Sequence, residues 1–241
     1  MNLAEIRDRL AQLTPAARAT RRVRRDLAER HLSGAGLEIG ALHCPLQIPA
    51  AASVRYVDRM DLAGLRGHYP ELESKALVEV DVIDDGETLA AQPDASVDFV
   101  IANHFIEHTQ DPIGTIGNHL RVLRPGGIVY MAVPDREQTF DVLRAPTLFE
   151  HVLRDHREGP GWSRMPHFEE WARFVDRVPE AEVAGRAREL SEMDYSIHFH
   201  VWTPDEFAAM LTGARREAGL DFDVAEQQVN GIECVFILRR A

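Results

Sequence analysis

The sequence contains few cysteines and no long apolar run, and each shortage excludes a class of protein. Two cysteines among 241 residues, Cys44 and Cys234, cannot build a disulfide framework or a four-ligand zinc site. A run of about 18 or more apolar residues is missing, so we expect no transmembrane helix. The first thirty residues are charged and lack the apolar core of a signal peptide. These observations favour a cytoplasmic enzyme or binding protein.

Positive charge is also scarce, because 27 basic residues face 39 acidic ones and the net charge is −12. Nucleic acid is a poor partner for such a surface, since binding it depends on neutralising phosphates. Residues 1–30 reverse the balance, with eight arginines against four acids. The cluster Arg21, Arg22, Arg24 and Arg25 favours a solvated helix face, which can also pack on acidic surface of the same protein. An arm over a ligand site is the alternative.

Short apolar runs alternate with helical or polar stretches over residues 35–133. The runs lie at 37–39, 54–57, 76–80, 97–102 and 128–133, and this alternation predicts a parallel sheet with helices on both faces. Thr203, Pro204 and Glu206 form a capping-box pattern that predicts a helix over 203–219. The pair Asn230-Gly231 between two further strand patterns, at about 221–229 and 232–238, predicts an antiparallel hairpin.

A glycine and two acids follow the first three predicted strands. GLEIGALHCP, residues 36–45, ends its strand at Gly40, where a side chain would block the close approach of a cofactor. Only one glycine falls in this loop, so the GxGxxG dinucleotide fingerprint is absent. Asp58 follows Gly40 by 18 residues, the position from which an acid accepts hydrogen bonds from two ribose hydroxyls. Asp81 can accept from an adenine amine. A simple strand-to-helix turn is the alternative for the glycine loop, and a helix N-cap or an exposed strand end is the alternative for Asp58.

Two longer stretches extend this pattern: DASVDFVIANHFIEHTQDP, residues 94–112, and RVLRPGGIVYMAVPD, residues 121–135. Together with the acid series they resemble class I S-adenosylmethionine-dependent methyltransferases over about residues 34–135 and 200–240. The resemblance implies a Rossmann-like α/β fold: a seven-stranded, mostly parallel sheet with a C-terminal antiparallel hairpin, N-terminal helices and a helical cap insertion. It divides the chain into an N-terminal arm (1–33), a cofactor-binding core (34–135 and 200–241) and an acceptor-binding cap (136–199).

The resemblance also implies which residues hold S-adenosylmethionine. Glu38 and Gly40 match the first motif of the family, Asp58 its ribose-binding acid and Asp81 its adenine-binding acid. The remaining expected contacts lie beside these residues or at the end of the fourth strand: Ala41, Arg59, Val82, Asn103 and His104. The loop departs from the family where Ala41, Leu42 and His43 replace glycines, which leaves the contacts to the amino-acid end of the cofactor open.

Five shorter stretches resemble a bacterial subgroup of this family that is often encoded beside glycosyltransferases: LEIGALHCP, ANHFIEH, VPDREQTFD, FEHVLRDH and HFHVWTPDEF. This resemblance implies a small polar acceptor, most readily the hydroxyl of a sugar or oligosaccharide precursor in polysaccharide biosynthesis. The expected activity is therefore carbohydrate O-methylation. An amine or carboxylate acceptor is the alternative, followed by a nicotinamide-dependent oxidoreductase and an inert binding protein that kept the fold. We expect no membrane partner, and a homodimer slightly ahead of a monomer.

Methyl transfer to an alcohol requires a general base or a metal to take up one proton. His104 closes the fourth strand with Asn103 and is the first candidate base. His108 lies one turn further and can face the same pocket. Asp135 ends the fifth strand, as a base or a magnesium ligand. For each of them a structural or cofactor-packing role is the alternative, and the sequence leaves magnesium dependence open.

His198 and His200 are the last two catalytic candidates. In a strand their spacing would direct both side chains to one face, where they would contact the acceptor or bind a metal. Two residues do not make a metal site, and structural packing is the alternative. Further aromatic side chains lie on or beside the cap. We expect its histidines at the surface: His151, His156 and His167. We expect at least two of the three tryptophans to pack the cap: Trp162, Trp171 and Trp202.

Overall fold

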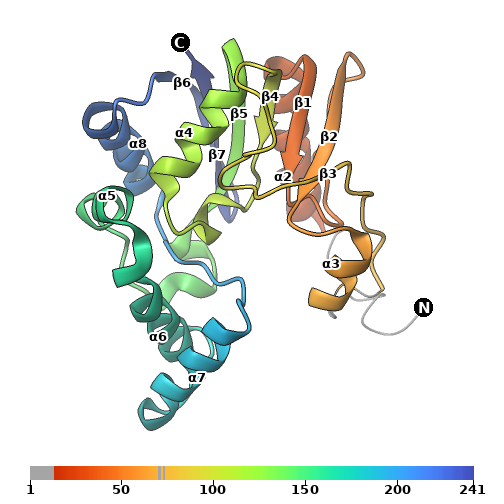
Figure 1. Ribbon diagram of the computed structural model, residues 1–241. Helices are drawn as coiled ribbons and strands as arrows, with labels where there is room; N and C mark the ends of the chain where they lie inside the picture. Colours follow the sequence, from red (N-terminus) through yellow and green to blue (C-terminus); the bar gives the residue numbers. More distant parts are fainter. Residues whose placement is uncertain (1–13, 70–71, 73) are drawn as a thin grey trace.

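The structure of the protein is a computed structural model that describes residues 14–69, 72 and 74–241. A seven-stranded sheet forms its centre, in the order β3-β2-β1-β4-β5-β7-β6 (Figure 1). The strands are β1 (Gly34–Ile39), β2 (Ala52–Asp58), β3 (Val82–Ile83), β4 (Val97–Ile101), β5 (Leu123–Pro134), β6 (Phe222–Asn230) and β7 (Glu233–Arg240). Strands β1 to β5 are parallel, whereas β7 runs antiparallel to both β5 and β6. The predicted fold class is confirmed.

Helices cover both faces of this sheet, as the alternating sequence pattern predicts (Figure 1). Helix α2 packs on one face through Leu27 and Ala28, against Phe99, Tyr130 and other residues of the strands. The opposite face packs against α4 and α8. The helices are α2 (Pro15–His31), α3 (Leu62–His68), α4 (Pro112–Val122), α5 (Phe149–Glu158), α6 (Arg164–Phe174), α7 (Glu180–Glu192) and α8 (Pro204–Ala218), with 3-10 turns η2 (Ile106–His108), η3 (Arg136–Gln138), η4 (Phe140–Leu143) and η5 (Pro160–Trp162). The helical spacing of Leu3, Ile6 and Leu10 also predicts a helix near the start of the chain, but these residues lie outside the described ones.

The predicted boundary signals around α8 and the hairpin are present. The Thr203 hydroxyl accepts from the Glu206 amide at 3.3 Å, and the Glu206 carboxylate accepts from the Thr203 amide at 2.7 Å, so the capping box is complete. The hairpin turn lies one residue later than predicted, at 231–232, since Asn230 still pairs with Glu233. Gly231 has a φ of +69°, a conformation that favours glycine.

The third strand differs from the prediction, which placed it at 76–80. The chain meets β2 only at Asp81, whose amide donates to the Tyr56 carbonyl at 2.9 Å and whose carboxylate accepts from the Tyr56 amide at 2.8 Å. Strand pairing then covers only Val82 and Ile83. The apolar run at 76–80 is loop, and the strand is a short edge strand of the kind that limits edge-to-edge aggregation.

Residues between β5 and α8 form the predicted helical cap. Helix α5 packs on the main core through Val152, whereas α6 and α7 enclose a small core of their own that includes Phe168, Trp171 and Leu190. Figure 1 shows α6 and α7 projecting beyond the sheet as a separate lobe. Within the described part of the chain, no helix is both long and apolar enough to cross a membrane.

Candidate functional site

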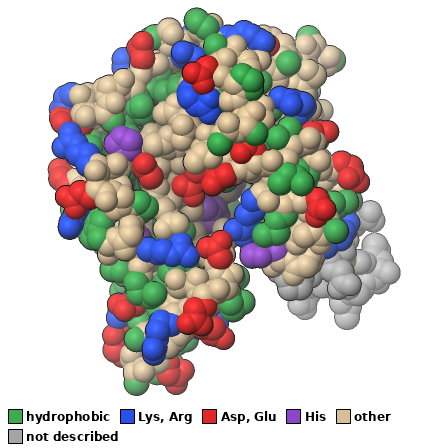
Figure 2. All heavy atoms as spheres, in the orientation of Figure 1, with side chains coloured by type: hydrophobic (Ala, Val, Ile, Leu, Met, Phe, Trp, Pro, Cys, Tyr) green, Lys and Arg blue, Asp and Glu red, His purple; other side chains and the backbone are tan. Residues whose placement is uncertain are grey.

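A cleft of about 750 Å³ opens at the carboxyl ends of the strands. This volume lies in the range of about 300–1,000 Å³ that is typical of small-molecule sites. Figure 2 shows it as a hollow between the cap lobe and the α3 side, with acidic side chains and a histidine at its floor. The core contributes Gly40, Asp58, Arg59 and the loop 83–87, and the cap contributes Arg164, 194–196 and Phe199. The segment after β4 contributes His104, Phe105, His108 and Gln110.

The glycine loop gives this cleft its first wall. Gly40 has a φ of +62°, and its amide donates to the Val57 carbonyl at 3.0 Å, which fixes the turn that leaves β1. The Glu38 carboxylate is buried beneath the loop and accepts from the Leu46 amide at 2.8 Å. Burial raises the pKa of Glu38 to about 7, against the smaller opposing effect of this hydrogen bond. Glu38 therefore holds the loop from below, and Ala41 is buried in the same loop.

Acidic side chains line the neighbouring strand ends. Asp58 lies in the cleft, where burial raises the pKa of its carboxyl. Asp81, predicted as the adenine-binding acid, instead precedes β3, and its carboxylate is engaged by the Tyr56 amide. The acids that do follow β3 into the cleft are Asp84 and Asp85. Sequence spacing did not single them out, although the run Ile83-Asp84-Asp85-Gly86, like Glu38 and Gly40 in the first loop, places an acid shortly before a glycine.

Two further predicted cofactor contacts lie next to the cleft. Val82 is half-buried in β3, one residue before the lining residue Ile83. The Asn103 amide oxygen accepts from the Ala132 amide at 3.0 Å, which ties the end of β4 to β5.

Arg59 lines the cleft and its guanidinium pairs with Asp194 of the cap at 3.0 Å. Arg164 pairs with the same carboxylate at 3.1 Å, so a chain of charges bridges the core and the cap.

His104 lies in the cleft with a strained backbone, since its φ of +49° is uncommon for a residue other than glycine. Its Nε2 lies 2.7 Å from the Glu233 carboxylate and its Nδ1 lies 3.5 Å from Glu107. Burial lowers the pKa of His104, but the hydrogen bonds to Glu107 and Glu233 outweigh burial and raise it to about 9. The ring is therefore an imidazolium at neutral pH, a state that cannot accept a proton.

Arg24 explains part of the basic cluster in α2. Its guanidinium donates two hydrogen bonds to the Glu233 carboxylate, with Nε 2.7 Å from Oε1. Glu233 also binds His104. Burial raises the pKa of Glu233, but these two cations outweigh it and bring the pKa down to about 2. Of the predicted cluster, Arg24 thus contacts an acid of the same protein, whereas Arg21 and Arg22 lie exposed on the helix. Because Glu233 also binds His104, it connects α2 to a residue that lines the cleft.

His108 lines the cleft in the opposite protonation state. Its Nδ1 lies 2.9 Å from the Ile197 carbonyl, an acceptor only, so Nδ1 carries the proton and Nε2 keeps its lone pair. Burial lowers the pKa of His108 to about 4, against the smaller opposing effect of Glu107. Behind it stands His198, with ring centroids 4.7 Å apart, and Asp141 accepts from His198 Nδ1 at 2.7 Å. The arrangement is a neutral imidazole backed by an Asp-His pair.

The remaining two catalytic candidates lie away from this arrangement. Asp135 caps η3 by accepting from the Glu137 amide at 2.9 Å, which is the turn role named as its alternative. His200 is fully buried in the cap, with its ring 5.6 Å from that of His151. The segment 196–200 is not a strand, and His198 and His200 enter two separate clusters. The expectation that both face one pocket is wrong.

The tryptophans and histidines of the cap differ in their surroundings: two tryptophans pack inside it, and two histidines belong to a cluster of possible metal ligands. Trp171 and Trp202 are buried, as expected of at least two tryptophans, and Trp162 is exposed beneath the Arg154 guanidinium. His156 is half-buried beside Asp111. His167, expected at the surface, is 7% exposed, and burial first, then His151, lowers its pKa to about 3. His151 and His167 join His200 in the cluster described below.

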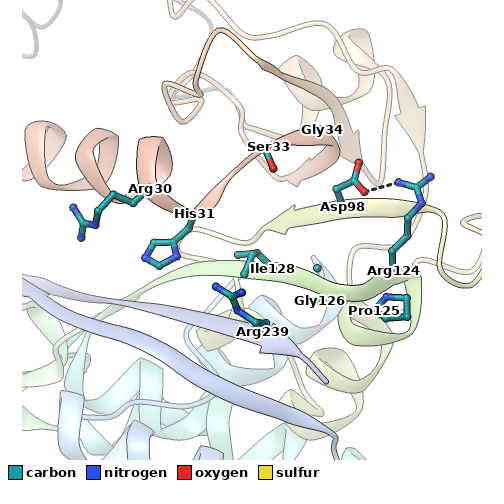
Figure 3. A pocket seen from close by; sticks show the side chains of 11 residues that line it. Arg30, His31, Ser33, Gly34, Asp98, Arg124, Pro125, Gly126, Ile128 and Arg239 are labelled. Carbon is teal, nitrogen blue, oxygen red and sulfur yellow. Dashed lines mark hydrogen bonds and ion pairs between the residues drawn. The ribbon is translucent and has the colours of Figure 1, made fainter.

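A second hollow, of about 400 Å³, opens at the amino ends of the strands (Figure 3). Three arginines line it: Arg30, Arg124 and Arg239. Arg30 pairs with Glu226, and Arg124 pairs with Asp98 at 2.7 Å. The hollow lies at the wrong end for a cofactor, because ligands of open parallel sheets bind outside the carboxyl ends of the strands.

An open α/β sheet with a glycine turn and acids at its carboxyl ends is the arrangement in which proteins of this fold class bind nucleotide-bearing ligands. The chain belongs to the methyltransferase domain family, whose model matches residues 65–215. A probable S-adenosylmethionine-dependent methyltransferase of Mycolicibacterium smegmatis is 34% identical over 79 residues, which cover 33% of this chain and 28% of that protein. The chain therefore aligns with less than a third of that relative.

Solved structures share the fold at low identity. The carbon methyltransferase CurJ has a TM-score of 0.50 and 13% identity, covering 96% of this chain and 57% of that one. A Rhodobacter sphaeroides structure provisionally named a Zn-dependent alcohol dehydrogenase has a TM-score of 0.53 and 17% identity, covering 95% and 91%. Identities of this size indicate the common fold alone.

Proposed function

We propose that the protein is an S-adenosylmethionine-dependent methyltransferase that acts on a small polar acceptor, with a carbohydrate hydroxyl as the first candidate. The observation that carries the proposal is the cleft itself, where Gly40, Asp58 and Asp84 meet at the carboxyl ends of neighbouring strands. Gly40 has no side chain, which leaves room for a cofactor against the backbone. These features fit a ribose-bearing, positively charged cofactor, since the acids offer acceptors and negative charge.

We assign the cofactor contacts residue by residue. Asp58 accepts from the ribose hydroxyls, and Asp84 or Asp85 replaces Asp81 as the acid that meets the adenine amine. Gly40, Arg59 and His104 line the same cleft. The other predicted contacts act from behind: Glu38 and Ala41 support the glycine loop, Val82 places Ile83, and Asn103 fixes the end of β4.

His108 is the proposed general base. When bound, S-adenosylmethionine supplies the methyl group and a sulfur leaving group. His108 Nε2 takes the proton of the attacking hydroxyl, because its lone pair is free and the ring is neutral above a pKa of about 4. His198 and Asp141 hold His108 from behind. His104, as an imidazolium between two carboxylates, orients this segment rather than accepting a proton.

The polar walls of the cap side of the cleft support a polar acceptor. Arg164, Asp194 and Ser196 offer hydrogen-bonding groups, and Tyr195 and Phe199 offer ring faces of the kind that stack on sugars. We assign this surface, within residues 136–199, to the acceptor. An amine or carboxylate acceptor is the alternative, and it would use the same surface. Magnesium has little support, because the described clusters are rich in histidine and magnesium prefers oxygen ligands.

Mass spectrometry of acceptors incubated with the protein and S-adenosylmethionine tests the proposal. A panel of mono- and oligosaccharides, matched with amino sugars and sugar acids of the same ring type, separates the acceptor classes. We expect one added methyl group on a hydroxyl of a sugar. Methylation of the amino or acid partner alone would reject the O-methyl assignment and keep the cofactor chemistry. Boiled protein and S-adenosylhomocysteine-inhibited protein serve as controls.

A further inference from the structure

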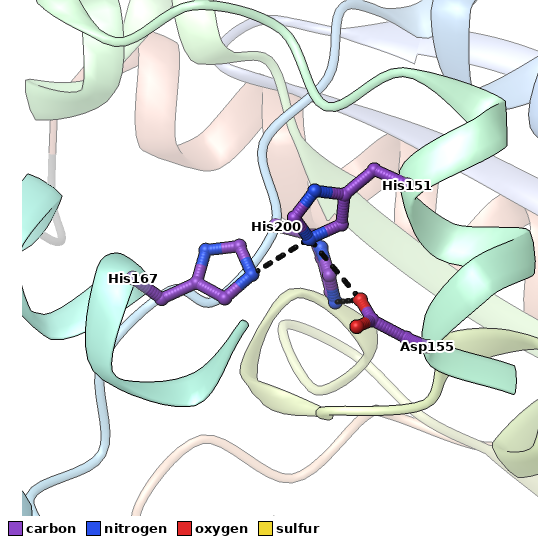
Figure 4. Close-up of side chains that lie close together, drawn as sticks. All are labelled: His151, Asp155, His167 and His200. Carbon is purple, nitrogen blue, oxygen red and sulfur yellow. Dashed lines mark hydrogen bonds and ion pairs between the residues drawn. The ribbon is translucent and has the colours of Figure 1, made fainter. Parts of the chain in front are cut away.

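We propose that His151, Asp155, His167 and His200 form a binding site for a divalent transition-metal ion, zinc first, that fastens the cap. The four residues come from three segments: α5 carries His151 and Asp155, α6 carries His167, and the segment before α8 carries His200. Each offers one ligand atom, and the four atoms lie within 4.8 Å of one another. Figure 4 shows the three rings and the carboxylate converging on one point.

Three of the distances between the ligand atoms lie near the edge length of a tetrahedral zinc site, and all lie within 4.8 Å. Zinc binds imidazole nitrogen and carboxylate oxygen at about 2.0–2.2 Å, so the edges of an ideal tetrahedron are about 3.3–3.6 Å long. The measured edges are 3.0 Å between His151 Nε2 and His167 Nε2, and 3.2 Å between His151 Nε2 and Asp155 Oδ2. The edge from His200 Nε2 to Asp155 Oδ2 is 3.7 Å. Small rotations of the rings would equalise these edges.

Burial of the site calls for a cation. Asp155 and His200 are almost fully buried, and Asp155 Oδ2 and His200 Nε2 have no hydrogen-bond partner among the described residues. A buried carboxylate oxygen without a partner is costly. The ion pairs of Asp155 within the described chain are those with His151 and His200. A divalent ion would accept all four lone pairs and compensate the carboxylate charge.

The ligands are already oriented for this role by their neighbours. The Ser163 hydroxyl donates to Asp155 Oδ1 at 2.6 Å, which leaves Oδ2 directed at the three rings. His200 stacks on Trp202 at a centroid distance of 5.6 Å, and His167 contacts Phe199 edge-on. Hydrogen bonds like that of Ser163 commonly fix metal-ligating carboxylates, and the ring contacts restrict the two imidazoles. With four protein ligands the site is closed and structural, and nitrogen-rich ligation favours zinc or a similar transition metal over magnesium.

The position of the site explains what an ion would do there. It would join α5, which packs on the core, to α6 of the cap lobe and to the segment that carries Ser196 and Phe199 into the cleft. The ion would not contact the reacting groups, since His108 and His198 belong to the other cluster. The proposal is therefore independent of the acceptor and of the methyl-transfer activity.

Elemental analysis of the full chain tests this proposal. The protein is expressed with zinc in the medium, its affinity tag is removed because polyhistidine binds metal, and metal content is measured by plasma mass spectrometry. We expect one equivalent of zinc per chain in the wild type and its loss in both His151→Gln and Asp155→Asn. His156→Gln is the matched control, since it changes a half-buried histidine on the same helix that pairs with Asp111 outside the cluster. This variant should keep its metal.

Cobalt substitution and heat denaturation give second readouts that do not depend on activity. Protein stripped with chelator and reloaded with cobalt(II) should show the intense visible bands of tetrahedral coordination, and these should vanish in Asp155→Asn. The melting temperature of the stripped wild type should rise on adding zinc, whereas that of Asp155→Asn should not. A folded wild type that takes up no zinc or cobalt would overturn the proposal, as would variants that keep the metal.

Discussion

The two hollows at opposite ends of the sheet differ in how their charges are used. At the amino ends, Arg124 and Asp98 neutralise each other near the surface, and Arg30 does the same with Glu226 (Figure 3). At the carboxyl ends, Asp58 lies in a cleft where burial raises its pKa. His104 and His108 are held there in opposite protonation states.

The difference follows from the direction of the strands. Parallel strands end together, so the residues that follow β1, β2, β3 and β4 gather on one edge, whereas their amino ends receive the connecting segments. Perturbed pKa values cluster where burial and specific partners act together, which is a property of functional sites. The comparison predicts that equivalent substitutions at the two ends have unequal effects.

The largest contrast is expected for a histidine at each end. His108→Ala should lower kcat by about 10²–10⁴-fold, the usual contribution of a general base, with little change in affinity for S-adenosylhomocysteine. His31→Ala is the matched control, because His31 lines the other hollow and binds Glu226. Steady-state kinetics and calorimetric titration measure both. An unchanged kcat in His108→Ala would remove it from the mechanism.

A smaller contrast is expected for an aspartate at each end. Asp58→Ala should weaken binding of S-adenosylhomocysteine by about 10–100-fold, since hydrogen bonds to a charged acceptor are lost. Asp98→Ala should leave this affinity unchanged, because Asp98 pairs with Arg124 and accepts from the Ala35 amide, both far from the cleft. Calorimetric titration of both variants tests the pair, and equal losses would show that neither aspartate acts locally.

The protonation state of His104 predicts how stability depends on pH. Its folded-state pKa of about 9 lies above the ordinary value of 6.5, so its contribution is complete below pH 6.5 and is lost as pH rises through 9. The free energy of unfolding should fall more steeply across this window in the wild type than in His104→Gln. Urea denaturation at a series of pH values measures the slopes. Parallel slopes would show that His104 is not held as a cation.

The smallest effect is expected at the surface of the amino-end hollow. Arg30→Ala removes an exposed ion pair with Glu226, and such pairs contribute about 0–1 kcal/mol to stability. We expect a change in the free energy of unfolding within that range and no change in cofactor affinity. Urea denaturation and calorimetric titration of the same variant provide both values. A large loss of affinity would contradict the assignment of function to the carboxyl ends alone.

Local signals made most of the sheet predictable. The apolar runs of β1, β2, β4 and β5, the capping box at Thr203 and Glu206, and the hairpin signal at Asn230-Gly231 each depend on neighbouring residues, although the turn itself lies at 231–232. The third strand failed because its apolar run at 76–80 lies in a loop and the pairing that matters covers only Val82 and Ile83. Because of this error, Asp81 was proposed from the sequence as the adenine-binding acid, whereas the structure places it beside β2 and outside the cleft.

Long-range contacts account for what the sequence could not reveal about the site. The protonation state of His104 depends on Glu233, 129 residues later, and the oriented lone pair of His108 depends on the Ile197 carbonyl. His200 meets His151 and His167 only through the packing of the cap. No spacing rule links residues from three separate segments, so each of these histidines looks ordinary in the sequence.

Calorimetric titration of the wild type with S-adenosylhomocysteine tests the central claim most directly, with reduced nicotinamide cofactor as the comparison ligand. The account predicts saturable binding of one S-adenosylhomocysteine per chain and no heat with the nicotinamide cofactor. Absence of binding to folded protein would contradict the claim that the carboxyl-end cleft holds S-adenosylmethionine. Binding of the nicotinamide cofactor in its place would assign the cleft to redox chemistry.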